Sequence, residues 1–197
     1  MPMLLPHGYK VAWPAPSSAR GNRRWRRAVE PAAVRNVLFL CTGNSARSIM
    51  AEALLNFRGK DRFHAFSAGS HPKGEVHPLA LETLRRHGIP VGEVRSKSWN
   101  EFEAPDAPAL DFVFTVCDRA AAEVCPIWPG QPMTAHWGLQ DPADVAGTID
   151  DRRRAFNRTF RELDARLQLF TSLRIDQLDR LALKRELDAI GEIEDLG

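Results

Sequence analysis

The chain has 197 residues, of which 44% are hydrophobic and 26% charged, and this is the composition of a globular protein with one hydrophobic core. No apolar run approaches the roughly 18 residues that a membrane-spanning helix needs, so we expect no membrane partner and a cytoplasmic location. The net charge of +2 is uneven, because residues 1–35 carry seven basic residues and one acidic residue, and the rest of the chain carries 20 basic and 24 acidic residues.

Residues 1–34 form the basic part of the chain and show no helical or strand periodicity. Their cluster Arg23–Arg27 surrounds Trp25 with arginines, and such clusters can contact nucleic acid or an acidic surface. The simpler interpretation is a disordered extension, or sequence upstream of the true translation start. We favour the simpler interpretation, so we expect no nucleic-acid partner and place one catalytic domain at residues 35–197.

Apolar runs and turn residues alternate regularly from Asn36 onward. Ser48 is expected to cap the first helix, and residues 89–109 are expected to form a loop. Strands are expected at 36–41, 63–67, 110–116 and 133–137, and helices at 48–57, 78–87, 119–124, around 156–170 and at about 176–190. This alternation predicts an α/β fold: a three-layer, four-stranded parallel sheet with helices on both faces and an extra C-terminal helix within residues 172–197.

The first strand runs into a helix through a loop that has Cys41 at one end and Arg47 at the other. Such a loop points successive backbone N–H groups at one spot, which forms an anion-binding cradle. Arg47 adds a bidentate donor for an oxyanion, and Ser48 is placed to donate to the sulphur. These groups are expected to lower the pKa of Cys41 and make it a nucleophile. The predicted oxyanion-binding residues are Thr42, Gly43, Asn44, Ser45, Ala46, Arg47 and Ser48.

Three more residues with useful chemistry follow later elements: Cys117 and Asp141 come directly after strands, and Cys125 lies beyond a short helical turn. Because ligands bind beyond the carboxyl ends of parallel strands, we expect Cys41, Cys117 and Asp141 at one edge of the sheet. Cys117 and Cys125 can meet only if the turn between them deforms, which suits a redox cycle. Asp141 is a candidate general acid.

Each of these residues also has a plainer interpretation. The two later cysteines are equally compatible with buried core thiols, and the dipeptide Asp141-Pro142 is common in turns. The three cysteines lack the spacing of a zinc site, so no metal site is predicted.

Four stretches together resemble the arsenate reductases built on the low-molecular-weight protein tyrosine phosphatase fold. The loop alone does not separate a reductase from a phosphatase, whereas the second and third cysteines favour the reductase. The stretches occur in the family's order within about residues 34–170, and they are CTGNSARSIMAEAL, FSAGSHPKG, VCDRAAAEVCP and HWGLQDPA.

The resemblance implies a relay of three thiols that detoxifies arsenate. Cys41 attacks arsenate held by the loop and Arg47, and Asp141 assists the loss of water. Cys117 then attacks Cys41 and arsenite leaves, after which Cys125 takes over the disulfide. An external thiol reductant, either thioredoxin or a glutaredoxin and glutathione system, restores the thiols. No tightly bound cofactor is implied.

Two departures from the family pattern affect the chemistry. Ala46 stands where many relatives have a second loop cysteine, so a disulfide within the loop is excluded. Asp141 is followed by Pro142 and Ala143, without the tyrosine pair of the tyrosine phosphatases. This difference argues against an aryl phosphate as the substrate.

A third departure concerns potassium, which some reductases bind beside the loop. Asn44, Glu52 and Ser67 match that pattern, but its aspartate is replaced near Ser98. The resemblance therefore leaves a potassium ion open for this chain, with three matching ligands for it and the replaced aspartate against it.

Two alternative functions stay open. One is a phosphatase that hydrolyses phosphate monoesters through a Cys41 phosphoenzyme, with Cys117 and Cys125 idle. The other is a non-catalytic protein that binds an oxyanion or nucleic acid through its basic leader, and it predicts salt-sensitive DNA binding.

Overall fold

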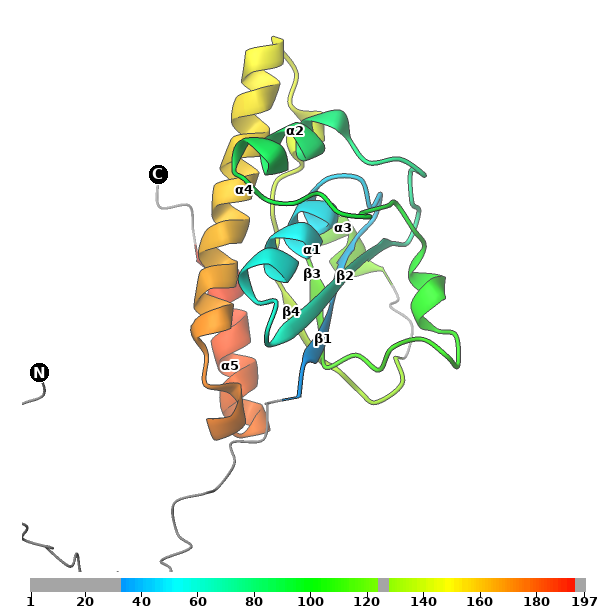
Figure 1. The fold of residues 1–197 in the computed structure, drawn as a ribbon, viewed down its shortest axis with the longest axis vertical. Coiled ribbons are helices and arrows are strands. Elements are labelled where there is room, and N and C mark those ends of the chain that lie inside the picture. Colours follow the sequence, from blue (N-terminus) through cyan, green and yellow to red (C-terminus); the bar gives the residue numbers. More distant parts are fainter. Residues whose placement is uncertain (1–32, 124–127, 194–197) are drawn as a thin grey trace, which may run out of the picture. The chain divides into compact units, whose positions relative to one another are not determined.

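The computed structural model of the protein describes residues 33–123 and 128–193. The predicted extension at residues 1–34 lies outside this part except for its last two residues, and Cys125 also lies outside it. Among the described residues, no helix is both long enough and apolar enough to cross a membrane. The elements in chain order (Figure 1) are β1 (Arg35–Cys41), α1 (Arg47–Arg58), β2 (Phe63–Gly69), α2 (Pro78–Arg86), a 3-10 helix (Trp99–Phe102), β3 (Phe112–Thr115), α3 (Asp118–Ala122), β4 (Met133–His136), a 3-10 helix (Pro142–Asp144), α4 (Ile149–Ser172), a 3-10 helix (Ile175–Gln177) and α5 (Arg180–Gly191).

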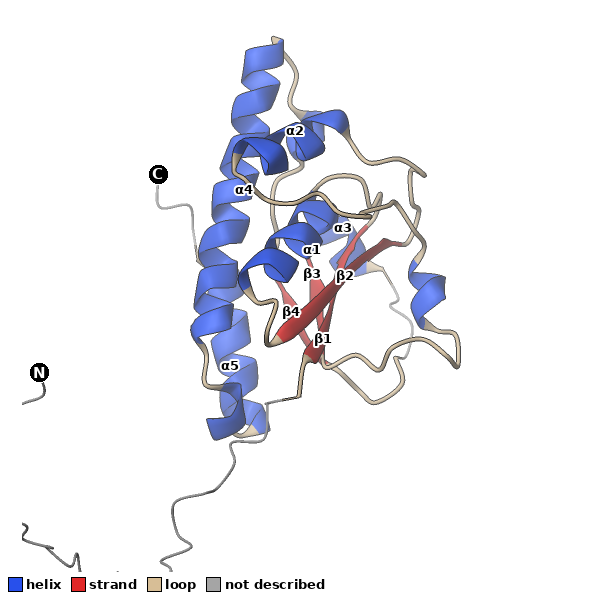
Figure 2. Ribbon diagram, in the orientation of Figure 1, coloured by secondary structure: helices blue, strands red, loops and turns tan. Residues whose placement is uncertain are grey.

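The four strands form one parallel sheet in the order β2-β1-β3-β4 (Figure 2), which confirms the predicted α/β fold. β1 lies between two neighbours, and its residues from Val37 to Leu40 are fully buried, which explains its unbroken apolar sequence. Leu40 of β1 is opposite Thr115 of β3. Because all strands run the same way, the residues that follow β1, β3 and β4 come together at one edge.

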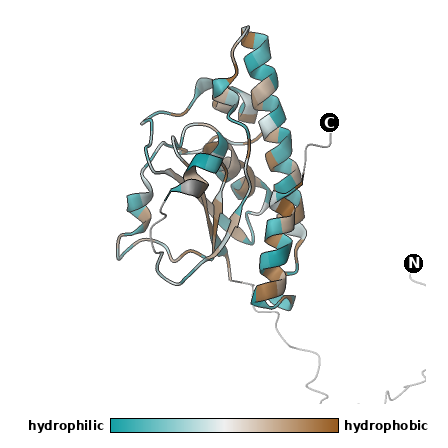
Figure 3. Ribbon diagram, turned by 180° about the vertical axis from the view of Figure 1, so that it is seen from behind, coloured by the Kyte–Doolittle hydropathy of each residue, from teal (hydrophilic) through white to brown (hydrophobic). Residues whose placement is uncertain are grey.

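Two hydrophobic clusters lie on opposite faces of this sheet. Because side chains alternate along a strand, β1 contributes Val37 and Phe39 to the larger cluster, which also contains side chains of α1, α2, α4 and α5. The smaller cluster contains Leu38 and Leu40, and the 3-10 helix Trp99–Phe102 covers it through Phe102. Figure 3 shows hydrophilic and hydrophobic residues side by side along α4, whose apolar face lies on the larger cluster.

Two local predictions are wrong. The first helix is not capped by Ser48, because α1 already begins at Arg47 and makes no side-chain capping bond; the Ser48 hydroxyl is instead bonded to the Cys41 sulphur. Residues 89–109 are not loop throughout, because the Ser98 side chain accepts a hydrogen bond from Asn100 N–H and starts the 3-10 helix Trp99–Phe102.

The last helix is a part of the core. α5 begins at Arg180 rather than near residue 176, because Asp179 caps it by accepting a hydrogen bond from Ala182 N–H at 2.8 Å. Its apolar side chains join the larger cluster, and Trp137 Nε1–H donates to the Leu187 carbonyl at 2.9 Å. Gly191 makes this approach feasible, since a Cβ there would lie 2.1 Å from the His136 carbonyl oxygen.

Replacing Leu187 with alanine therefore tests whether α5 stabilises the domain. Leu187 is fully buried, whereas Leu181 on the same helix is 62% exposed. We expect Leu187→Ala to lower the free energy of unfolding by about 3 kcal/mol. Leu181→Ala should change it by less than about 0.5 kcal/mol. Chemical denaturation of the two variants measures the difference, and equal effects would contradict this role of α5.

Candidate active site

The loop between β1 and α1 is held in place by hydrogen bonds that its backbone carbonyl groups accept. They accept hydrogen bonds from backbone N–H groups of the segment that follows β2: His71 to Thr42 at 2.9 Å, Lys73 to Gly43 at 3.0 Å and His77 to Ser45 at 2.9 Å. A trans peptide points its N–H away from its C=O. The N–H groups of Gly43, Asn44 and Ala46 therefore point inward, as an anion cradle requires.

Two residues make the tight curl of this loop feasible. Asn44 adopts the left-handed conformation with φ of 39°, which asparagine tolerates better than most residues. Gly69 faces the loop from β2, and a Cβ there would lie 2.5 Å from the Thr42 carbonyl oxygen. A larger residue at Gly69 would therefore displace the cradle.

The Cys41 sulphur lies beneath the cradle and is almost completely buried, with 3% of the residue exposed. The Ser48 hydroxyl is 2.9 Å from Sγ, and Asn44 N–H donates to Sγ at 3.1 Å. The predicted contact between Ser48 and the sulphur is thus present.

The prediction of a lowered pKa for Cys41 is wrong. Burial raises the pKa of the thiol above its ordinary value, and the nearby Cys117 thiol adds to the rise. The hydrogen bond from Ser48 and the charge of Arg47 lower the pKa, but they do not offset the loss of water around the sulphur.

Arg47 is turned toward the loop that follows β4. Its Nη1 donates to the Leu139 carbonyl at 2.8 Å, and its Nη2 to Asp141 Oδ2 at 2.5 Å. The other carboxylate oxygen of Asp141 accepts a hydrogen bond from Ala143 N–H at 3.1 Å and so caps the 3-10 helix Pro142–Asp144. Asp141 is therefore the turn residue of the plainer interpretation, and its carboxylate also contacts Arg47. Its role as a general acid stays a prediction.

A cavity of about 140 Å³ lies between the loop and Asp141. Pockets for drug-sized ligands measure roughly 300 to 1,000 Å³, so this cavity suits a single small ion. Its wall includes three basic side chains and two acidic ones, and the six residues that matter for its chemistry are Cys41, Arg47, Lys73, Arg119, Asp141 and Asp144.

Cys117 lies at the same edge of the sheet, at the N-terminus of α3. It is 2% exposed, and its sulphur accepts a hydrogen bond from Ala120 N–H at 3.4 Å. The Thr42 hydroxyl lies 3.7 Å from this sulphur and 3.5 Å from Glu123 Oε1. The structure thus places two free, buried thiols at the ends of neighbouring strands. The role of Cys125 stays a prediction.

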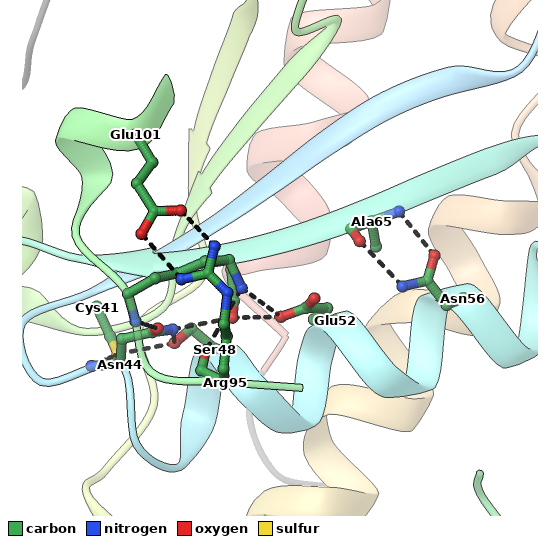
Figure 4. A network of polar contacts seen from close by, with 10 residues as sticks. Cys41, Asn44, Ser48, Glu52, Asn56, Ala65, Arg95 and Glu101 are labelled. Carbon is green, nitrogen blue, oxygen red and sulfur yellow. Dashed lines mark hydrogen bonds and ion pairs between the residues drawn. The ribbon is translucent and has the colours of Figure 1, made fainter. Parts of the chain in front are cut away.

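A polar network lies under the loop (Figure 4). Asn44 Nδ2 donates to Ser48 Oγ and to Ser67 Oγ, both at 2.9 Å, and Ser67 Oγ donates to Glu52 Oε2 at 2.5 Å. The network therefore connects the carboxylate of Glu52 on α1 to the hydroxyl that contacts Cys41. Among the described residues, no group of three or more His, Cys, Asp or Glu side chains could hold a metal ion.

Sequence reasoning missed three basic residues near the site. Lys73 and Arg119 line the cavity, and Lys97 donates to Glu52. Lys73 and Arg119 lie within the stretches that resemble the family, and their position past strand ends was the available signal. Lys97 lies in an aperiodic segment and offered no such signal.

Replacing Ser48 with alanine removes the hydroxyl that contacts Cys41. Because this contact lowers the pKa of the thiol, we expect the pH profile of Cys41 alkylation by iodoacetamide to move to higher pH. The measurement uses Cys117→Ser/Cys125→Ser protein, in which Cys41 is the remaining thiol. Ser172→Ala, at the exposed end of α4, is the control, and an unchanged profile for Ser48→Ala would contradict the assignment.

The sheet order, the strand-loop-helix with its buried thiol and the small cavity are features of a phosphatase-like α/β fold. Residues 36–182 match the family described as low molecular weight phosphotyrosine protein phosphatase, and the chain belongs to this family.

Its relatives within the family include enzymes named arsenate reductase. The chain is 36% identical over 134 residues to one from Shouchella clausii (strain KSM-K16) and 33% identical over 134 residues to one from Bacillus subtilis (strain 168); each match covers 68% of this chain and 93% of the relative. A solved structure described as an arsenate reductase in the phosphate binding state superimposes with a TM-score of 0.59 at 25% identity, covering 71% of this chain and 98% of that chain. The predicted resemblance is confirmed.

Proposed function

We propose that this chain reduces arsenate to arsenite through a thiol relay that starts at Cys41. The observation that carries the proposal is the second buried thiol, Cys117, at the end of the strand beside Cys41. A phosphatase needs one thiol at this edge, whereas a two-electron reduction needs two. The names of the relatives support the same substrate.

In the first step the Cys41 sulphur forms a bond to arsenic. Burial raises the pKa of the Cys41 thiol, and the thiol proton leaves before or as the sulphur–arsenic bond forms. Asp141 lines the same cavity and relays this proton to an arsenate hydroxyl, which departs as water. The loop N–H groups and Arg47 stabilise the charge of the bound oxyanion.

In the second step the Cys117 sulphur attacks the Cys41 sulphur and forms a disulfide. The sulphur–arsenic bond breaks, and its electron pair stays on arsenic, which passes from arsenic(V) to arsenic(III) and leaves as arsenite. The proton of the Cys117 thiol passes to an oxygen of the departing arsenite, and the two thiols together give up two electrons, so the step balances.

In the third step Cys125 attacks Cys117 and carries the disulfide to an external reductant of the thioredoxin or glutaredoxin and glutathione type. Free thiols at this site suit the reducing cytoplasm, which we propose as its location. No tightly bound cofactor takes part in these steps.

The second candidate function, hydrolysis of phosphate monoesters, uses the same loop and rests on the family match. Two observations argue against an aryl phosphate as the substrate. Among the described residues, those that line the cavity include no Phe, Tyr or Trp to stack on an aromatic ring. In addition, Pro142 and Ala143 follow Asp141.

One pair of assays separates the two functions. We expect NADPH oxidation that depends on arsenate when thioredoxin and thioredoxin reductase, or the glutaredoxin system, are supplied. Hydrolysis of p-nitrophenyl phosphate, measured in parallel, should be weak. Phosphate-ester hydrolysis without arsenate-dependent oxidation in either system would contradict the proposal.

A further inference from the structure

Lys97 is a buried cation beside the polar network under the loop. Its side chain is 7% exposed, and its Nζ donates to Glu52 Oε2 and to the Arg95 carbonyl, both at 3.4 Å. The guanidinium of Arg95 points elsewhere and binds Glu101 at 2.5 and 2.9 Å (Figure 4). The ammonium of Lys97 thus faces a carboxylate that is itself only 12% exposed.

The same residue also holds the loop through its backbone. Lys97 N–H donates to Asn44 Oδ1 at 2.7 Å, and this segment is attached to the end of β2 by the bridge between Gly69 and Ser98. Lys97 therefore contacts the network at two points, with its backbone at Asn44 and its ammonium at Glu52.

These contacts show that the site does not fit a potassium ion. Potassium would need the oxygens of Asn44, Glu52 and Ser67 as ligands. Asn44 Oδ1 already accepts from Lys97 N–H, Ser67 Oγ donates to Glu52, and Glu52 Oε2 already receives the lysine ammonium. The aspartate that the potassium pattern requires near Ser98 is absent, and the neighbouring residue that reaches Glu52 is a lysine.

We propose that the Lys97 ammonium supplies, as part of the chain, the positive charge that the buried Glu52 carboxylate needs, so that the site works without a monovalent cation. A buried carboxylate without a charged partner is strongly unfavourable. Lys97 keeps Glu52 in place, and Glu52, through Ser67 and Asn44, keeps Ser48 against the Cys41 sulphur. Lys97 is in this sense a positioning residue.

The inference rests on the proposed role of Cys41 as the attacking thiol, and its test does not need arsenate turnover. The readouts are the thermal midpoint and the rate of Cys41 alkylation by iodoacetamide in the Cys117→Ser/Cys125→Ser protein. Both are measured in potassium chloride and in tetramethylammonium chloride at equal ionic strength. If arsenate reduction fails while these results hold, the proposed function is wrong and the role of Lys97 stands.

Protein with Lys97 intact is expected to show the same midpoint and rate in both salts. Lys97→Ala should lower the midpoint and slow alkylation roughly tenfold in both salts, the lower end of the range for residues that orient a functional group from behind. Potassium should not restore either, because the backbone N–H of residue 97 still donates to Asn44 Oδ1 and Ser67 still donates to Glu52. The double variant Glu52→Gln/Lys97→Met, which removes both charges, should lie closer to the parent than Lys97→Ala in both readouts, because it buries no unpaired carboxylate. Lys60→Ala, at an exposed lysine after α1, is the control and should match the parent.

Two results would overturn the inference. One is a midpoint or rate that rises specifically with potassium while Lys97 is intact. The other is a Lys97→Ala protein that matches its parent in both the midpoint and the alkylation rate, or whose losses are not smaller in Glu52→Gln/Lys97→Met.

Discussion

Arsenate turnover is expected to fall by at least about 10⁴-fold when Cys41 is replaced with serine, a loss of the size seen when a catalytic nucleophile is removed. The serine oxygen is a poor nucleophile here, and it cannot form the disulfide that reduces arsenic. Steady-state kinetics with a coupled reductase measures the loss. p-Nitrophenyl phosphate hydrolysis should disappear as well, because both candidate reactions begin at this sulphur.

The fold of Cys41→Ser provides the control for this experiment. Cys41 is buried among Ser48 and the loop N–H groups, and a serine oxygen can accept the same hydrogen bonds. The variant should therefore unfold at a similar denaturant concentration. A folded variant that keeps more than about one-hundredth of the turnover would contradict the role of Cys41, since lost nucleophiles cost far more.

Replacing Cys117 with serine is the second large effect, and it separates the two functions. Without the second thiol the arsenic–sulphur intermediate cannot release arsenite, so arsenate turnover should fall by at least about 10³-fold. Phosphate-ester hydrolysis needs only Cys41, so any such activity should change by less than about threefold, as expected for a group outside that reaction. The ratio of the two activities is the measured quantity.

The Cys117 result has a clear contrary outcome. If Cys117→Ser protein reduces arsenate at the parental rate, the second thiol is a buried core residue and the relay is wrong. Arg119→Ala is a useful companion, because Arg119 lies on the cavity wall but carries no electrons. It should raise KM for arsenate and leave the formation of the disulfide intact.

Much of the fold was predictable because its signals are local. A central parallel strand is buried on both faces, so β1 shows as an apolar run, and the loop from Cys41 to Arg47 is recognisable from its place between that strand and a helix. Cys117 and Asp141 were placed at the same edge because parallel strands all end there. The apolar spacing of α5 was also visible, although the cluster that it joins was not.

The failures concern properties that depend on tertiary packing. The pKa of Cys41 was predicted in the wrong direction because desolvation depends on what covers the sulphur, which no local pattern encodes. The sequence predicts Ser48 as a helix cap because serine favours that position. In the structure its hydroxyl is instead hydrogen-bonded to the Cys41 sulphur. Lys97 was missed because an aperiodic segment gives no sign of which side chain turns inward.

The relay is tested most directly by one turnover with Cys125→Ser protein. This variant should stop after the second step, since the thiol that takes over the disulfide is missing. After reduction, removal of the reductant and addition of one equivalent of arsenate, peptide mapping by mass spectrometry is expected to find Cys41 disulfide-bonded to Cys117. One arsenite should be released per chain. Cys41 and Cys117 recovered as free thiols, with no arsenite formed, would contradict the account.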